Sequence, residues 1–293
     1  MRARGRLKQC ESNGAILPII VLYKVPLAES STYKSLMASM RLCDQSESAI
    51  AVYDNSPDPQ VSETEQRQLF AYKHDPSNPG LAVAYNWAME KVPSTRANWL
   101  LLLDQDSVLP LNFFDLSLEA IRAYESDDRL AAAVPKVLSG GNLVSPACVK
   151  WYGLKRLSPV KTGIQNFEIR AINSGALIRC SFMQLVGGFD QAYRLDLVDH
   201  WLFSQIYSRG FHVALTNIEI LHDLSASRPH QYSIGRYQSI LSGERQLVLS
   251  SRSRSDALIY RLRLFFRAIK QFVQYRRPDL SVMSIRQMCH WMF

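Results

Sequence analysis

Two carboxylates one residue apart, Asp104 and Asp106, directly follow the apolar run 99–103, whose sequence is Trp-Leu-Leu-Leu-Leu. Such a run predicts a strand buried on both faces, as in a parallel or mostly parallel sheet. Ligands of open α/β sheets bind beyond the carboxyl ends of the strands, so both acids are candidates for chemistry. Mg²⁺ in particular is usually held by one or two carboxylates together with substrate phosphates. The alternative is an exposed turn, since Asp and Gln are ordinary turn residues.

Two more strand ends carry side chains that could contact a nucleotide. Tyr23 closes a strand predicted over 16–23, and Asp54 follows a strand predicted over 49–53. An Asp can accept a hydrogen bond from the N3–H of uracil or thymine, and an aromatic ring can stack on the base. The structural alternatives are an Asx-turn at Asp54, which its Asn-Ser-Pro neighbours make equally plausible, and an aromatic at the core edge for Tyr23.

A second pair of acids, Asp196 and Asp199, opens a helix predicted over about 197–208. Asp196 is a good N-cap, and an acid three residues later occupies the capping-box position; this structural role is the commoner one. The functional alternative makes one of them a general base that deprotonates an acceptor hydroxyl. His222 follows a strand predicted over 218–221 and could supply a metal ligand, although a polar loop histidine is commoner.

The elements that must position these residues alternate between short apolar runs and helical stretches, which predicts βαβ units in an α/β fold. The poorly patterned segment 145–170 predicts a long loop or irregular strands near the site. Strands are expected at 16–23, 49–53, 69–73, 99–103 and 131–137, with a final strand pair at 211–214 and 218–221, and helices at 30–41, 81–91 and 197–208.

The composition is that of an ordinary globular protein, with 293 residues, 47% of them hydrophobic, enough for one large domain or two smaller ones. Five scattered cysteines without a Cys-x-x-Cys favour a reducing compartment and argue against a disulfide framework or a zinc site. The apolar stretch 15–22 is too short to span a bilayer, and no small-residue cleavage site follows it. We therefore expect a cytoplasmic protein.

Two nucleotide-binding signatures are missing from the sequence. It contains neither a Gly-x-Gly-x-x-Gly after the first strand nor a Gly-x-x-x-x-Gly-Lys-Ser/Thr. A dinucleotide oxidoreductase and a P-loop NTPase are therefore not expected. The charge of any bound diphosphate would have to be met by a metal ion rather than by a glycine-rich loop.

The net charge of +8 is concentrated at the two ends of the chain. From Arg228 onward there are twelve Lys or Arg against three acids. Within 255–274 five apolar residues repeat at steps of four and three, while Arg263, Arg267 and Lys270 lie on another side of the expected helix. A basic amphipathic helix predicts a membrane-surface element, and a helix packed on the domain is an equal alternative. Nucleic acid is not expected as a partner, because no recognisable module is present. The five apolar residues are Leu258, Leu262, Phe265, Ile269 and Phe272.

Taken in order, six segments over about residues 15–225 resemble the family 2 glycosyltransferases, which have the GT-A fold, and among them the rhamnosyltransferase-like members. The resemblance implies a Rossmann-like, mostly parallel mixed sheet flanked by helices over 15–225, between a basic tail at 1–14 and a basic, helical C-terminal extension at 226–293. The six segments are Ile19-Ile20-Val21-Leu22-Tyr23, Val52-Tyr53-Asp54-Asn55-Ser56, Asn78-Pro79-Gly80-Leu81-Ala82-Val83-Ala84-Tyr85-Asn86, Leu102-Leu103-Asp104-Gln105-Asp106, Asn173-Ser174-Gly175, and Val186-Gly187-Gly188-Phe189-Asp190 leading into Asp196-Leu197-Val198-Asp199.

The resemblance also implies roles for individual residues toward a nucleotide-diphospho-sugar donor, a TDP- or UDP-sugar. Tyr23 and Asp54 would hold the pyrimidine base, and Asp104 would lie near the ribose or sugar. The implied loop and helix beside the nucleotide contribute Asn78, Gly80 and Asn86. The implied ligands of a Mg²⁺ or Mn²⁺ ion that bridges the diphosphate are Asp106 and His222. Asp199 matches the family's general base, with Asp196 the weaker candidate.

The implied reaction is an inverting, in-line displacement in which Asp199 takes the acceptor proton. Many relatives carry Arg where Gln205 stands, and the Gln-x-x-Arg-Trp of processive synthases is missing, so transfer of a single sugar, with rhamnose a candidate, is expected. The acceptor would be a glycan or lipid-linked hydroxyl in cell-surface polysaccharide synthesis, with the enzyme peripheral to the inner face of the cell membrane.

Two other classes of function stay open at this point. One is a non-catalytic module that binds a sugar nucleotide or a membrane and retains the GT-A fold; the intact Asp104, Asp106 and Asp199 speak against it. The other is an enzyme that transfers a nucleotide to a sugar phosphate. That enzyme would need a glycine-rich loop and a basic residue near the start, where only Lys24 is available.

Overall fold

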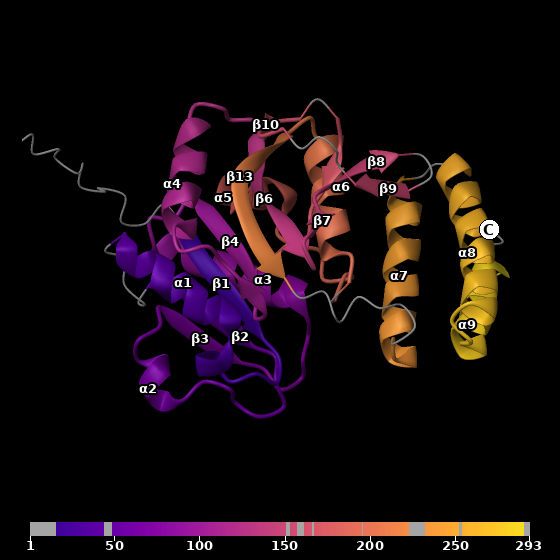
Figure 1. Ribbon diagram of the computed structural model, residues 1–293, viewed down its shortest axis with the longest axis horizontal. Coiled ribbons are helices and arrows are strands. Elements are labelled where there is room, and N and C mark those ends of the chain that lie inside the picture. The colour runs from indigo at the N-terminus through magenta and orange to yellow at the C-terminus, as the bar shows by residue number, and fades with distance from the viewer. Residues whose placement is uncertain are drawn as a thin grey trace, which may run out of the picture.

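A computed structural model describes residues 16–43, 49–150, 153–156, 161–165, 167–194, 196–222, 232–251 and 254–289. A large mixed sheet forms the centre, helices cover both of its faces, and three C-terminal helices stand together along one side (Figure 1). The N-terminal tail expected at 1–14 lies outside the described residues.

The central sheet has ten strands, of which eight form one continuous order, β10-β13-β6-β12-β4-β1-β2-β3. β12 is antiparallel to both of its neighbours and β10 is antiparallel to β13, whereas all other neighbours in this order are parallel. The mostly parallel α/β sheet expected from the sequence is thus confirmed. The bounds are β1 (Ile16–Leu22), β2 (Ala51–Asp54), β3 (Ala71–His74), β4 (Trp99–Asp104), β6 (Leu130–Ser139), β10 (Gly163–Ile164), β12 (Ala176–Arg179) and β13 (His212–His222).

Short strands extend this framework where the sequence pattern is poor. Two of them join the main sheet, β5 (Ser107–Val108) beside β13 and β7 (Asn142–Ser145) beside β6. Three form a small separate sheet, in the order β11 (Ile169–Arg170), β8 (Ala147–Lys150) and β9 (Gly153–Arg156). The irregular strands expected over 145–170 are therefore present.

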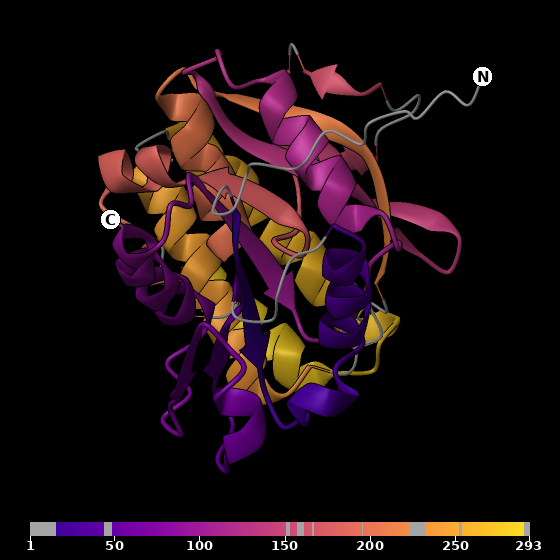
Figure 2. The same cartoon turned by 90° about the vertical axis from the view of Figure 1, so that its left-hand side faces the viewer.

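The helices fall into two layers and a C-terminal group. One face of the sheet is covered by α1 and α4, and the other by α3, α5 and α6. In Figure 2 these layers lie on opposite sides of the indigo strand β1. The bounds are α1 (Ser31–Leu42), α2 (Glu63–Gln66), α3 (Leu81–Lys91), α4 (Phe113–Ala123), α5 (Cys180–Val186), α6 (Val198–Ser208), α7 (Ile234–Ser251), α8 (Arg254–Val273) and α9 (Pro278–Cys289), with 3₁₀ turns at η1 (Leu27–Glu29) and η3 (Val92–Ser94).

The leucine-rich run forms a strand that is buried on both faces, as expected. Leu100 and Leu102 of β4 face the core under α3, whereas Leu101 and Leu103 face the core under α1 and α4. All four are fully buried. Alternate side chains point to opposite faces of a strand, so only a continuous apolar run can fill both cores.

The expected strand pair at 211–214 and 218–221 is wrong, because this segment forms the single long strand β13. Its parallel pairing with β6 shifts register between Leu215 and Glu219. The Thr216 side chain absorbs the irregularity by donating to the Val134 carbonyl at 3.2 Å and accepting from the Ile218 amide at 3.3 Å. The polar break in the sequence is therefore an irregularity within one strand rather than a turn.

The start of α3 is pressed against the loop that precedes α6. Gly80 has φ +104°, and a Cβ built on it would lie 2.0 Å from the carbonyl oxygen of Arg194. That carbonyl accepts a hydrogen bond of 2.6 Å from the Leu81 amide, and the Arg194 guanidinium donates to the Asn78 carbonyl at 2.5 Å. Only glycine fits both this conformation and this close approach.

We predict that Gly80→Ala destabilises the protein by about 3 to 5 kcal/mol, because it combines a disfavoured backbone conformation with a steric overlap. Gly140→Ala is the matched control: Gly140 also has positive φ, at +54°, but a Cβ there would meet nothing within 4 Å. It should cost only about 1 kcal/mol. Urea unfolding followed by fluorescence measures both, and equal losses would contradict the importance of the Arg194 contact.

Candidate functional site

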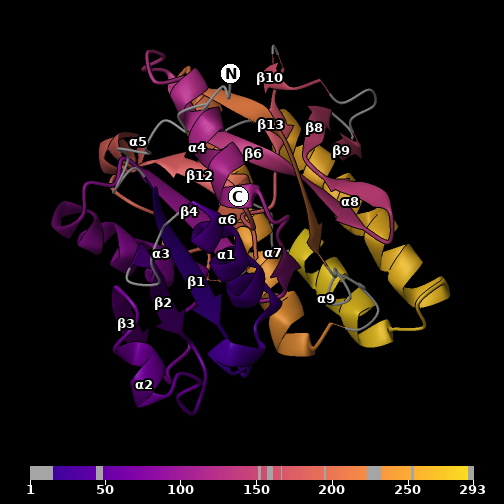
Figure 3. The same ribbon diagram turned by 60° about the vertical axis from the view of Figure 1, so that its left-hand side comes forward.

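The parallel strands bring their carboxyl ends to one edge of the sheet. Leu22 of β1 pairs with Asp54 at the end of β2, and Val21 pairs with Asp104 at the end of β4. The antiparallel strand β5 then places Ser107 opposite His222, the last residue of β13. Figure 3 shows β1 and β13 running in the same direction toward this edge. Residues from four distant parts of the chain are thereby collected into one region.

Polar contacts link the first acidic pair to His222. The Asp106 side chain is half exposed, and its Oδ1 lies 3.5 Å from Nδ1 of the buried His222. The Ser107 hydroxyl lies 2.9 Å from the same Nδ1 and 2.6 Å from the Ser174 hydroxyl. Ser174 in turn accepts a hydrogen bond of 3.4 Å from the Asp104 amide. Neither serine was a candidate from the sequence, since serine is too common to single out without its partners.

Asp104 and Asp199 interact electrostatically, although they are far apart in the sequence. The pKa of Asp104 is raised to about 6, mainly because the carboxyl is buried; the nearby His222 lowers it, and the negative charges of Asp106 and Asp199 raise it. The pKa of the buried Tyr85 is likewise raised well above its usual value, first by burial and then by Asp104 and Asp199. Asp199 therefore belongs to the same region as the first acidic pair.

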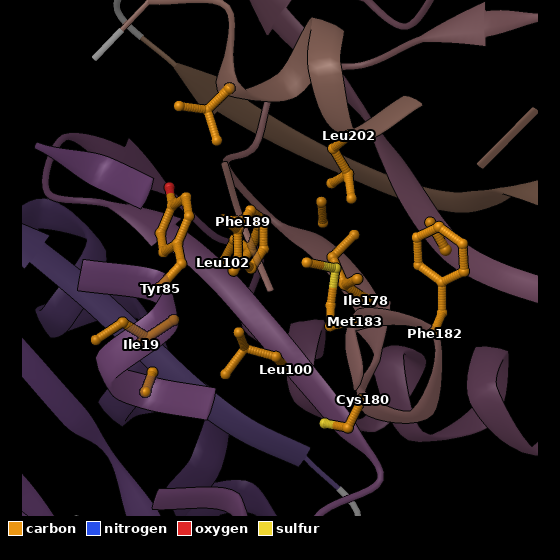
Figure 4. Packing of buried hydrophobic residues seen from close by; sticks show 14 of the residues in the cluster. Ile19, Tyr85, Leu100, Leu102, Ile178, Cys180, Phe182, Met183, Phe189 and Leu202 are labelled. Carbon is orange, nitrogen blue, oxygen red and sulfur yellow. The ribbon is translucent and has the colours of Figure 1, made fainter. Parts of the chain in front are cut away.

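Tyr85 is a site residue that sequence reasoning missed. It lies on α3, and its ring centroid is 5.1 Å from that of Phe189. Figure 4 shows the two rings side by side. Its hydroxyl and Asn173 Oδ1 are both buried without a hydrogen-bond partner of good geometry among the described residues. An aromatic residue at helical spacing is usually core, so nothing in the pattern distinguished Tyr85 from the residues that pack around it.

The two acids of the second pair, Asp196 and Asp199, have different structural surroundings. Asp199 stands in the first turn of α6, half buried, and its Oδ1 accepts from the His200 amide at 2.8 Å. Asp196 is not the N-cap that the sequence predicted: the cap is Leu197, with φ +71° and no side-chain capping bond. Asp196 instead pairs with Arg236 of α7 at 3.1 Å. This long-range ion pair replaces the local cap.

Asp54 adopts the Asx-turn that its neighbours favoured. The side chain has no exposed surface, and Oδ1 accepts from the Ser56 amide at 3.0 Å. Oδ2 accepts from the Gln60 amide at 2.6 Å and from the Tyr72 hydroxyl at 3.1 Å. Asp54 thus shapes the loop after β2, and its contact with a pyrimidine base stays a prediction.

Tyr23 presents an exposed ring beside this loop, with 43% of its surface accessible. Its backbone is held from both sides by the Gln105 side chain, which accepts from the Tyr23 amide at 2.7 Å and donates to its carbonyl at 3.2 Å. Lys24 lies with its ammonium 5.1 Å from the ring centroid. The loop after β4 therefore fixes the position of the aromatic ring at the end of β1.

Asn86 fastens α3 to the glycine-containing loop before α6. Its Oδ1 accepts from the Phe189 amide at 2.7 Å, and its Nδ2 donates to the Phe189 carbonyl at 2.8 Å. A Cβ on Gly188 would come within 2.7 Å of that Oδ1. Like Asn78 and Gly80, Asn86 thus joins two segments that border the site, and any direct contact with a nucleotide stays a prediction.

The donor atoms at Asp106 and His222 suit a divalent cation that also binds substrate oxygens. Among the described residues, no group of three or more His, Cys, Asp or Glu side chains is arranged to hold a metal ion. A carboxylate and an imidazole nitrogen are chemically suitable donors, and Mg²⁺ commonly relies on few protein ligands plus substrate phosphates. The pair could therefore hold an ion only as part of a larger set of ligands.

Comparisons with known proteins identify the fold. No family model matches the sequence, and no curated protein matches it. Among solved structures, the fold is similar to S. aureus TarS 1-349, with a TM-score of 0.50 and 12% identity over 88% of this chain and 72% of that one. A longer S. aureus TarS, of which 43% is covered, and TarS 1-349 in complex with UDP both give TM-scores of 0.48, with 11% and 12% identity, each over 88% of this chain. The fold of this chain is therefore similar to that of TarS 1-349.

We predict that Asn86→Ala lowers the free energy of unfolding by about 2 kcal/mol, because it leaves the Phe189 amide and carbonyl without their partners. Asn112→Ala is the matched control, since Asn112 is exposed at the start of α4 and makes no capping bond. That change should stay within about 0.5 kcal/mol. Thermal denaturation compares the two, and unchanged stability of Asn86→Ala would contradict this structural role.

Proposed function

We propose that this protein is a glycosyltransferase that moves one sugar from a nucleotide-diphospho-sugar to a hydroxyl group. The observation that carries the proposal is the gathering of Asp104, Asp106, His222 and Asp199 at the carboxyl edge of the sheet. In open α/β sheets this edge is where ligands bind. The fold alone would not support a glycosyltransferase function, because one fold hosts many functions.

In the proposed reaction Asp199 is the general base. The acceptor O–H gives its proton to the Asp199 carboxylate, and the acceptor oxygen attacks the anomeric carbon of the donor. The bond from that carbon to the diphosphate oxygen breaks, the electron pair leaves with the nucleoside diphosphate, and the configuration inverts. The position of Asp199 in the first turn of α6, half buried and near Asp104, supports this role.

Asp106 and His222 would hold the Mg²⁺ or Mn²⁺ ion that we propose as cofactor. A cation there would neutralise charge on the departing diphosphate. The Ser107 hydroxyl lies 2.9 Å from His222 Nδ1, the ring nitrogen that also faces Asp106, and Ser174 holds that hydroxyl at 2.6 Å. Partners of this kind normally fix the ring position and the tautomer of a metal-binding histidine.

The nucleotide would lie toward the ends of β1 and β2. The exposed ring of Tyr23 offers a surface on which a uracil or thymine base can stack, and Lys24 adds a positive charge beside it. The Asx-turn of Asp54 shapes the loop on the other side of this region. A UDP- or TDP-sugar donor, with rhamnose as a candidate sugar, fits these contacts and the sequence resemblance.

We further propose a glycan or lipid-linked acceptor in cell-surface polysaccharide synthesis and an enzyme on the cytoplasmic side of the membrane. The second candidate function is a non-catalytic module that binds sugar nucleotides. Asp104, Asp106 and Asp199 favour the enzyme, because binding alone does not require a base and two acids beside it. Release of nucleotide from a donor panel with an extracted glycolipid acceptor separates the two.

Asp199→Asn should lower turnover by about 100- to 10,000-fold, because the amide cannot take the acceptor proton. The Asn oxygen can still accept from the His200 amide, so stability should change little. Asp115→Asn, an exposed acid on α4, is the control and should keep full activity. Nucleotide release under saturating donor measures the effect, and a fully active Asp199→Asn would rule out this base.

Removal of divalent cations with a chelator should abolish transfer, and added Mn²⁺ or Mg²⁺ should restore it. Asp106→Asn should raise the metal concentration for half-maximal activity by about tenfold or more, because one of two protein ligands loses its charge. A metal titration of nucleotide release gives this value, with Asp115→Asn again as control. Full activity of the metal-stripped protein would refute the role of Asp106.

A further inference from the structure

The apolar stripe of α8 faces outward. Five residues form the stripe expected from the sequence, and Phe266 and Val273 widen it, with 65% and 70% of their surfaces exposed. Figures 1 and 3 show α8 on the outer side of the C-terminal group, away from the sheet. We call these seven residues the α8 outer face; the exposed fractions of the others are Leu258 59%, Leu262 52%, Phe265 46%, Ile269 46% and Phe272 62%.

Polar contacts on the opposite side of α8 hold it in this orientation. Arg267 donates two hydrogen bonds, of 2.7 and 2.9 Å, to the Glu244 carboxylate of α7, and the Tyr260 hydroxyl donates to the same carboxylate at 3.1 Å. Gln271 accepts from the Ser284 hydroxyl of α9 at 2.8 Å. Turning the stripe inward would break these contacts, and breaking a largely buried ion pair is costly.

Small and apolar residues complete the packed side, so the stripe is not needed for the local core. Leu264 is fully buried, Ala268 is 3% exposed, and Leu280 of α9 packs in the same cluster. The packed-helix alternative for the stripe is therefore wrong for the described residues. An apolar face of this kind on a soluble protein usually marks an interaction site.

Positive charges border the α8 outer face on both sides. At 100° per residue, Arg261 lies along one edge of the stripe and Arg263 and Lys270 along the other, and all three are exposed. In this part of the chain, Glu244 is paired with Arg267 and Asp279 with Arg277. An anionic surface would complement this arrangement.

We propose that the α8 outer face docks on the surface of an anionic lipid bilayer, with the apolar side chains in the headgroup region and Arg261, Arg263 and Lys270 against the lipid phosphates. This is how basic amphipathic helices lie on membranes. A second copy of the chain fits less well, because face-to-face pairing would bring the basic borders of both copies together. No helix among the described residues is long and apolar enough to cross a bilayer. Docking through this face does not require the proposed catalytic function.

The test is co-sedimentation of the full chain with vesicles of phosphatidylcholine alone or with 30% phosphatidylglycerol. We expect binding only to the anionic vesicles, weakened by added salt because screening reduces surface electrostatics. The double variant Phe266→Ser, Phe272→Ser should weaken binding by about tenfold or more, since both rings are more than half exposed and their loss removes apolar contact area. Leu185→Ser is the matched control, because Leu185 is 62% exposed on α5, and it should bind like the parent.

A charge variant, Arg261→Ala with Lys270→Ala, should weaken binding to anionic vesicles by about tenfold or more and reduce its dependence on salt. Circular dichroism checks that each variant remains folded. Three results would overturn the proposal: no binding to anionic vesicles, equal binding to neutral ones, or unchanged binding by the folded double phenylalanine variant. Sedimentation velocity tests whether a second copy of the chain occupies this face instead. A dimer that dissociates in the double phenylalanine variant, together with no binding to vesicles, would show that the occupant is a second copy and not a lipid surface.

Discussion

The contact between Gly80 and the Arg194 carbonyl is the constraint on which the arrangement of the site depends. It joins the start of α3 to the loop before α6, and the side chain of Asn86, further along α3, fastens the same two segments. α3 carries Tyr85 and α6 carries Asp199, so the separation of these residues is set by backbone packing. A residue larger than glycine would force the two helices apart and move Asp199 relative to the sheet.

The other half of the site is set by the sheet itself. Parallel pairing of β1 with β2 and β4 brings Asp54 and Asp104 to one edge, and the short pairing of β5 with β13 adds His222. Side-chain hydroxyls then join these elements, since Ser107 links His222 to Ser174. The region is therefore held together from two directions, by the sheet and by the loops that pack on α3.

Helices and strands could be predicted from the sequence where a local pattern of apolar residues is sufficient to define them. The apolar run of β4 and the helix over 81–91 required only local information. The continuity of β13, the ion pair of Asp196 with Arg236 and the orientation of α8 did not follow, because each depends on a partner remote in the sequence. A hydrophobic stripe predicts an amphipathic helix, but it does not show which side of the helix packs against the protein. In α8 the side that packs carries Arg267, which pairs with Glu244 of α7. The acids at strand ends could be predicted from the sequence, whereas Tyr85, Ser107 and Ser174 are recognised as site residues only from their neighbours in the fold.

The ion pair between Asp196 and Arg236 has a consequence for where the working unit of this protein ends. The change in composition near residue 225 suggests a boundary, but this ion pair crosses it and ends only three residues before Asp199. A chain cut after β13 would keep every acid of the site and still lose the counter-charge of a mostly buried carboxylate in the turn that leads to α6. The C-terminal helices thus support the first turn of α6. The change in composition near residue 225 therefore does not divide the protein into structurally independent parts.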